Sequence, residues 1–255
     1  MKKIGFIFSL LLILTNNITY SQNQQRLHTQ NNNGWFMYTG NHALNEHWGL
    51  HLEAQLRRNN IVTDPQQLLL RTGINYYLNK QTTATVGYCF VQTNPYGEFA
   101  AKTDFPEHRI WEQLQYKNQV GRFEWVNRLR LEQRFVHNPT LQADSSYAPG
   151  NAIYSNRFRI LNRFSIPFKG KTIEDKSLYL SIYDELFINF GKNVAMNLLD
   201  QNRAYAAIGY KIPKVGRLEI GYMLQTVVKA DDIKIEDNYT LQVGLLANIP
   251  FKQHP

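Results

Sequence analysis

The chain has one cysteine, Cys89, so no intramolecular disulfide can form and a small disulfide-stabilised scaffold is excluded. A membrane-spanning helix needs about 20 consecutive apolar residues, and after residue 21 the chain has no apolar run approaching that length. His42, His47 and His51 are dispersed, and no group of histidine, cysteine and carboxylate has metal-ligand spacing. We therefore expect no metal and no cofactor.

The N-terminus has the three parts of a secretory signal peptide. Met1-Lys2-Lys3 is basic, an apolar run follows from Ile4 to Leu14, and small residues precede Gln22. This pattern predicts a signal peptide over residues 1–21, with cleavage after Ser21 and export. The mature chain is then either soluble after export or a barrel, because a barrel strand dilutes its apolar residues with polar ones.

Apolar and polar residues alternate in several segments. The clearest runs from Trp48 to Arg57, where every second residue is apolar. A period of two over ten residues is typical of a strand with one apolar and one polar face, and ten residues suffice for a tilted strand to cross a membrane. Similar segments recur between Trp35 and Phe251, eleven in all.

These strands favour a membrane barrel over a soluble sandwich. They reach ten or more residues, whereas soluble strands average about five or six. Tight turns alternate with long loops, and aromatic residues gather at both strand ends, as bilayer interfaces select. We predict an all-β fold, a closed antiparallel transmembrane β-barrel over residues 34–251 in a bacterial outer membrane, followed by a tail over residues 252–255.

Eleven strands conflict with the even number expected when both termini lie in the periplasm. We predict twelve, with the extra strand hidden between Gln24 and Asn33; ten is the alternative, and residues 22–33 could instead lie inside the lumen. Glu112 and Asp184 fall on the apolar face, where a charge is costly. A β-bulge beside each would turn them inward.

Four motifs resemble an uncharacterised family of outer-membrane barrels, a domain of unknown function among envelope proteins of the Bacteroidetes type. The motifs are Trp48-Gly-Leu-His-Leu-Glu53, His108-Arg-Ile-Trp-Glu-Gln113, Tyr183-Asp-Glu-Leu-Phe-Ile-Asn189 and Asn202-Arg-Ala-Tyr-Ala-Ala-Ile-Gly-Tyr210. The resemblance covers nearly the whole mature chain. It implies a barrel and its location, and it implies no activity or site.

The polar face of the strands is rich in charge. Alternation places these residues toward the lumen: Arg71, Arg109, Arg128, Arg130, Glu132, Arg134, Arg157, Arg159, Arg163, Glu185 and Arg203. Arginine and glutamate could pair and fill the lumen, since barrels near eight strands are just wide enough to be packed by side chains. A barrel of about twelve strands could instead leave a narrow passage whose surplus positive charge favours small anionic solutes. We favour the filled lumen, and both remain open.

We therefore predict a structural or narrow-channel barrel, surrounded by outer-membrane lipid, that is not an enzyme. A lipid hydrolase built on Ser155, Ser165, Ser177 or Ser181 is one alternative, although no histidine is near them in sequence. A protease using Asp104, Glu107 and His108, or His137 and Asp144, is another. Loops over residues 92–106 and 136–153 could bind ligands or envelope protein partners. Nucleic acid is not an expected partner of an exported barrel.

Overall fold

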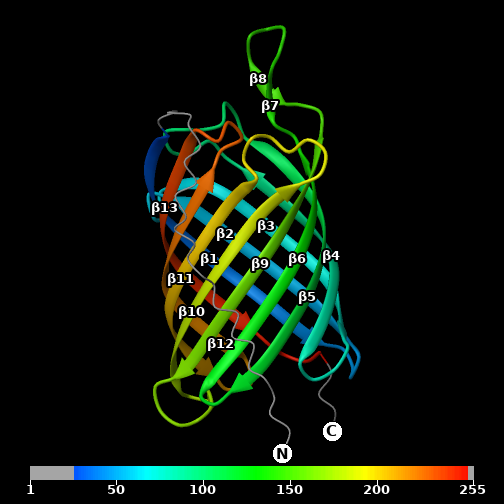
Figure 1. The fold of residues 1–255 in the computed structure, drawn as a ribbon, viewed down its shortest axis with the longest axis vertical. Coiled ribbons are helices and arrows are strands. Elements are labelled where there is room, and N and C mark those ends of the chain that lie inside the picture. The colour runs from blue at the N-terminus through cyan, green and yellow to red at the C-terminus, as the bar shows by residue number, and fades with distance from the viewer. Residues whose placement is uncertain (1–25, 252–255) are drawn as a thin grey trace, which may run out of the picture.

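The computed structural model describes residues 26–251. Eleven of its strands close into a barrel, tilted against the barrel axis (Figure 1). The barrel strands are β1 (Leu27–Ala43), β2 (Trp48–Asn59), β3 (Asp64–Tyr77), β4 (Thr82–Thr93), β5 (Phe105–Val120), β6 (Phe123–Val136), β9 (Ile153–Pro167), β10 (Leu178–Phe190), β11 (Leu199–Ile212), β12 (Gly216–Val228) and β13 (Lys234–Ala247). The described part of the chain contains no helix long and apolar enough to span a membrane.

Each barrel strand pairs with its neighbours in the order β1-β13-β12-β11-β10-β9-β6-β5-β4-β3-β2, and β2 pairs with β1. All of these pairs are antiparallel except one. β1 and β13 close the barrel in parallel, from Leu27 opposite Lys234 to Gly40 opposite Ala247. The predicted closed all-β barrel is confirmed, and its closure differs from a purely antiparallel one.

The predicted number of twelve strands is wrong, and so is the alternative of ten. Residues 27–33 continue directly into residues 34–43 as one strand of 17 residues, β1. They form neither a separate strand nor a segment inside the lumen. The eleven strands that periodicity indicates are the strands that form the barrel, and parallel closure is what accommodates an odd number. The predicted signal peptide and tail lie outside the described residues.

The two ends of the barrel differ. One end, which we call the turn end, carries the connections at residues 44–47, 78–81, 121–122, 168–177 and 213–215. The other, the loop end, carries those at residues 60–63, 94–104, 137–152, 191–198 and 229–233. Within residues 137–152 two short strands, β7 (Pro139–Leu141) and β8 (Tyr147–Pro149), form a hairpin that projects beyond the barrel (Figure 1).

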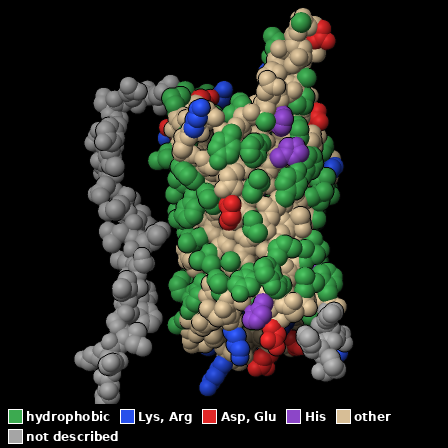
Figure 2. Space-filling view, turned by 90° about the vertical axis from the view of Figure 1, so that its right-hand side faces the viewer, with side chains coloured by type: hydrophobic (Ala, Val, Ile, Leu, Met, Phe, Trp, Pro, Cys, Tyr) green, Lys and Arg blue, Asp and Glu red, His purple; other side chains and the backbone are tan. Residues whose placement is uncertain are grey.

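Alternation along each strand sends polar side chains inward and apolar ones outward. The outer wall is covered by hydrophobic side chains, and charged ones gather mainly at the two ends (Figure 2). The cause is the pleat, since successive side chains point to opposite faces of a sheet. The lumen therefore receives nearly all of the buried charge.

Glu112 and Asp184 are exceptions, and the expected bulges beside them do not form. Both residues stay in register with their neighbours and point outward. Glu112 accepts a hydrogen bond from Gln133 Nε2 at 3.1 Å, and Asp184 accepts one from Asn202 Nδ2 at 3.0 Å. An amide on an adjacent strand thus partners each carboxylate without any change of register. Register shifts occur elsewhere, at Arg57/Arg58 and Phe187/Ile188.

Candidate functional site in the lumen

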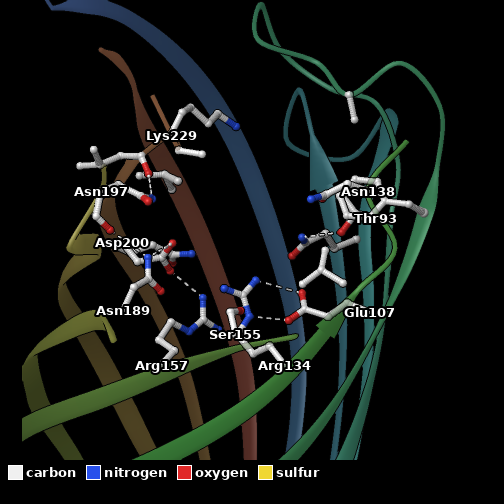
Figure 3. A pocket seen from close by; sticks show the side chains of 18 of the residues that line it. Thr93, Glu107, Arg134, Asn138, Ser155, Arg157, Asn189, Asn197, Asp200 and Lys229 are labelled. Atoms are coloured by element: carbon white, nitrogen blue, oxygen red, sulfur yellow. Dashed lines mark hydrogen bonds and ion pairs between the residues drawn. The ribbon is translucent and has the colours of Figure 1, made fainter. Parts of the chain in front are cut away.

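The lumen holds two cavities, one toward each end. The loop-end cavity has a volume of about 700 Å³ and the turn-end cavity about 530 Å³. Figure 3 shows the loop-end cavity, with side chains from opposite walls pointing into it. We call the residues that line both cavities the waist: Trp35, Gln55, Arg71, Arg159 and Arg203. These side chains stand between the two spaces.

Glu132 on β6 is the centre of the charge network at the waist. Its side chain has 0% exposure, and its two oxygens accept from Arg157 Nη2 at 2.6 Å and Arg159 Nη1 at 2.8 Å. Arg71 Nη2 lies 3.6 Å and Arg109 Nη1 3.9 Å from the same carboxylate. One buried anion is thus shared by four arginines from three other strands, β3, β5 and β9.

Further carboxylates extend this network on both sides. Glu185 on β10 accepts from Arg159 Nη2 at 2.8 Å and Arg128 Nη2 at 2.7 Å. Glu53 on β2 accepts from Arg71 Nη1 at 2.5 Å. Arg159 and Arg71 therefore each bridge two glutamates. Charge-assisted bonds of this kind are strong, and buried pairs depend on such multiple partners to offset desolvation.

The loop-end cavity has its own ion pairs. Glu107 accepts from Arg109 Nε at 2.8 Å and from Arg134 Nε at 2.5 Å. On the opposite wall Asp200 accepts from Arg157 Nη1 at 2.6 Å; Figure 3 shows this pair and the pair of Arg134 with Glu107. The lining of this cavity contains nine Lys or Arg residues and two acidic ones. Positive side chains therefore outnumber negative ones in the lining, although Arg71, Arg159 and Lys229 also pair with carboxylates outside it.

Three aromatic side chains lie among the arginines. Arg130 lies over Trp111 with 4.7 Å between its guanidinium carbon and the ring centroid, and Arg159 lies over Phe187 at 4.3 Å. Arg57 lies over Trp35 at 3.8 Å. These rings are not among the residues predicted to face the lumen. Strand alternation does indicate two of them, because Trp111 follows Arg109 by two residues and Phe187 follows Glu185 by two.

All eleven residues singled out from the sequence lie on the inner wall or within the network. Arg71, Arg159 and Arg203 are at the waist; Arg109, Arg134 and Arg157 line the loop-end cavity; Arg128, Arg130, Arg163 and Glu185 line the turn-end cavity, and Glu132 is buried between the arginines. Arg163 pairs with Glu219. Two of the set, Arg130 and Arg203, have no carboxylate partner among the described residues.

The hydrolase candidates do not assemble into a catalytic arrangement. Ser165 donates to Ser181 at 3.2 Å, and no hydrogen bond joins any described serine to a histidine. Glu107 points inward to its two arginines, whereas the adjacent His108 bonds Tyr88 Oη at 2.5 Å. Asp104 accepts from Gln92, and Asp144 accepts from Ser146.

No group of three or more His, Cys, Asp or Glu residues within residues 26–251 could hold a metal ion. His42 and His51 have ordinary polar partners. His42 Nε2 lies 2.8 Å from Tyr38 Oη, and His51 Nδ1 lies 2.9 Å from Asn41 Oδ1.

The loop over residues 94–104 folds over the loop-end cavity. Tyr96 in this loop donates to Glu236 Oε2 on β13 at 3.1 Å, and Lys229 Nζ lies 2.6 Å from the other oxygen of that glutamate. Burial, and next the negative charge of Glu236, raise the pKa of Tyr96 well above its ordinary value. The phenol therefore remains a neutral donor that attaches the loop to the far wall.

Replacing Tyr96 with phenylalanine is expected to loosen this loop. The substitution removes a hydrogen bond to a carboxylate, worth about 1.5 kcal/mol or more, so hydrogen-exchange protection of the loop amides should fall by about tenfold. Hydrogen exchange followed by mass spectrometry measures this. Tyr147→Phe, at an exposed position on the β7–β8 hairpin, should leave the loop unchanged. Equal protection in the Tyr96 variant and the parent would show that other contacts hold the loop.

The sequence of the barrel matches one protein family. The model of that family, described as a protein of unknown function (DUF2490), matches residues 32–236. The chain belongs to this family. The DUF2490 match begins within β1 and ends within β13, so it includes residues of every barrel strand. The expected membership of an uncharacterised family is thus confirmed. No curated protein and no solved structure matches the chain.

Proposed function

We propose that the protein is an outer-membrane β-barrel whose lumen is closed at mid-height by an ion-paired plug, a non-enzymatic envelope barrel that is shut at rest. The observation that carries this proposal is the waist. Glu132, with 0% exposure, is shared among arginines from other strands, and two of these, Arg71 and Arg159, line both of the cavities of about 700 and 530 Å³. A lumen filled by charged pairs and rings does not conduct until they move.

The outer wall supports placement in a lipid bilayer. Large apolar side chains are exposed around it, among them Val86, Ile208 and Ile220, each more than half exposed. Soluble monomers rarely expose apolar patches beyond a few hundred Å². Aromatic pairs lie at both ends of the wall, with Trp48 against Tyr76 toward the turn end and Phe135 against Tyr154 toward the loop end. The barrel strands are 12–17 residues long, which is enough for a tilted strand to cross a bilayer.

The test combines insertion and conductance of the full-length protein refolded into lipid. Lipids brominated on their tails should quench the fluorescence of outward-facing Trp48 and Trp125, because these rings would lie against the bilayer. In a planar bilayer the same preparation should show no steady single-channel current. Absence of quenching would overturn the membrane placement. Quenching together with a steady current would overturn the plug.

A narrow anion channel is the second candidate, and the unbalanced charge of the lumen favours it. Arg57, Arg130 and Arg203 are buried without a carboxylate partner among the described residues. If the waist opened, these side chains would line a passage that selects anions. The reversal potential under a salt gradient identifies this case, since an open channel would be anion-selective.

A further inference from the structure

Three arginines in the lumen have only neutral acceptors. Arg57 donates to Gln55 and Gln67, Arg130 to Gln113, and Arg203 to Gln201. All 20 Asp and Glu side chains of the chain lie within the described residues, because residues 1–25 and 252–255 contain none. None of these carboxylates forms an ion pair with Arg57, Arg130 or Arg203.

Arg57 and Arg203 form a pair at one place in the loop-end cavity. Their guanidinium carbons lie 3.8 and 5.0 Å from the centroid of the same ring, that of Trp35. The two side chains come from β2 and β11, on different parts of the wall, and both line the cavity of about 700 Å³. Two positive charges thus face one ring, and neither forms an ion pair with a carboxylate of the described residues.

Among the described residues, the surroundings of this pair provide neutral hydrogen-bond acceptors and no ion pair. Arg203 is buried, its Nε has no hydrogen-bond partner, and its Nη2 reaches only Gln201 Oε1 at 3.0 Å. Trp35 is held in place by its own bond from Nε1 to Gln66 Oε1 at 3.0 Å. Cations removed from water are destabilising unless they are paired, and like charges add mutual repulsion. An anion beside this pair would relieve both effects.

We propose that the loop-end cavity is a binding site for a small oxyanion, a solute carrying a carboxylate or phosphate group, recognised by Arg57 and Arg203 at the Trp35 ring. Oxyanions suit the planar guanidinium fork, which the same lumen uses for Glu107 and Glu132. The volume is in the range of small-molecule sites. The inference rests on the proposed function in one respect: if the waist is closed, this cavity opens only toward the loop end, and a bound anion cannot pass through the barrel.

The experiment is calorimetric titration of the refolded full-length protein in detergent micelles. Succinate and inorganic phosphate are the two probes, titrated separately at constant ionic strength set with chloride. We expect saturable binding of one anion per chain, and the tighter probe shows whether the group recognised is a carboxylate or a phosphate. The double variant Arg57→Gln/Arg203→Gln should bind at least about tenfold more weakly.

Arg134→Gln is the control. It removes one positive charge from the same cavity, where the double variant removes two, at an arginine whose partner Glu107 keeps Arg109. Binding should change by less than about twofold. Equal weakening in the control and the double variant would mean diffuse attraction by the cationic wall and would overturn the site.

A measurement on the unaltered protein covers the case in which the double variant does not fold. Its thermal unfolding midpoint should rise with succinate or phosphate relative to chloride at equal ionic strength, because a ligand that binds only the folded state stabilises it. If neither anion shifts the unfolding midpoint and neither gives binding heat, the proposed site is overturned. If planar bilayers also show no current, the proposed plug is unaffected by that result. If the anion binds and the protein also conducts a steady current, the proposed plug is overturned and the proposed binding site is retained.

Discussion

Glu132→Ala is expected to lower the free energy of unfolding by about 3–5 kcal/mol, because removing one partner of a buried ion pair leaves the other charge uncompensated. Here a single substitution leaves Arg157 and Arg159 without their shared carboxylate, and it also removes the second carboxylate near Arg109, 3.9 Å from Nη1 of that residue. Urea unfolding of the refolded barrel in micelles, followed by far-ultraviolet circular dichroism, measures the change.

Glu46→Ala is the control for this prediction. Glu46 is exposed in the connection at residues 44–47, so its removal should change the free energy of unfolding by no more than about 0.5 kcal/mol. A loss below about 1 kcal/mol in Glu132→Ala would contradict the central role of this carboxylate. Glu185 would then be carrying most of the compensation for Arg159.

Trp35→Ala is expected to join the two cavities and to produce a steady anion-selective current where the parent protein has none. Trp35 is 2% exposed, lines both cavities and lies against Arg57 and Arg203. Truncating a buried tryptophan also costs about 3–5 kcal/mol, so the variant should unfold at lower urea concentration. Single-channel recording with a salt gradient measures the current and its selectivity.

Trp48→Ala is the matched control, since Trp48 is 47% exposed on the outer wall at the turn end. It removes the same side chain without changing the lumen, and we expect this variant, like the parent protein, to show no steady current. If both variants insert into the bilayer and neither conducts a current, the ring of Trp35 is not what separates the two cavities. Arg71 and Arg159 would then be the next waist residues to replace.

Alternation was sufficient to separate the inner wall from the outer one. Arg128, Arg130 and Glu132 share a parity on one strand, and all three lie inward. The same rule correctly placed Glu112 and Asp184 outward; the expected bulges were an unnecessary correction, because Gln133 and Asn202 on adjacent strands partner them. The predicted strand number is wrong for a similar reason. Periodicity indicates eleven segments, and the rule of even numbers does not hold for a barrel that closes through a parallel pair of strands.

The sequence by itself determined the all-β architecture, the strands and the face on which each charge lies, because a period of two is a local property of the chain. The tertiary structure alone decided the parallel closure between β1 and β13, which joins residues about 200 positions apart. It also decided which charges pair. Arg163 meets Glu219 and Arg217 meets Glu124 across the lumen, between strands that are not neighbours. That Arg57 and Arg203 have no ion pair among the described residues could not be predicted either, because no pattern along one strand indicates which side chains lie on the opposite wall.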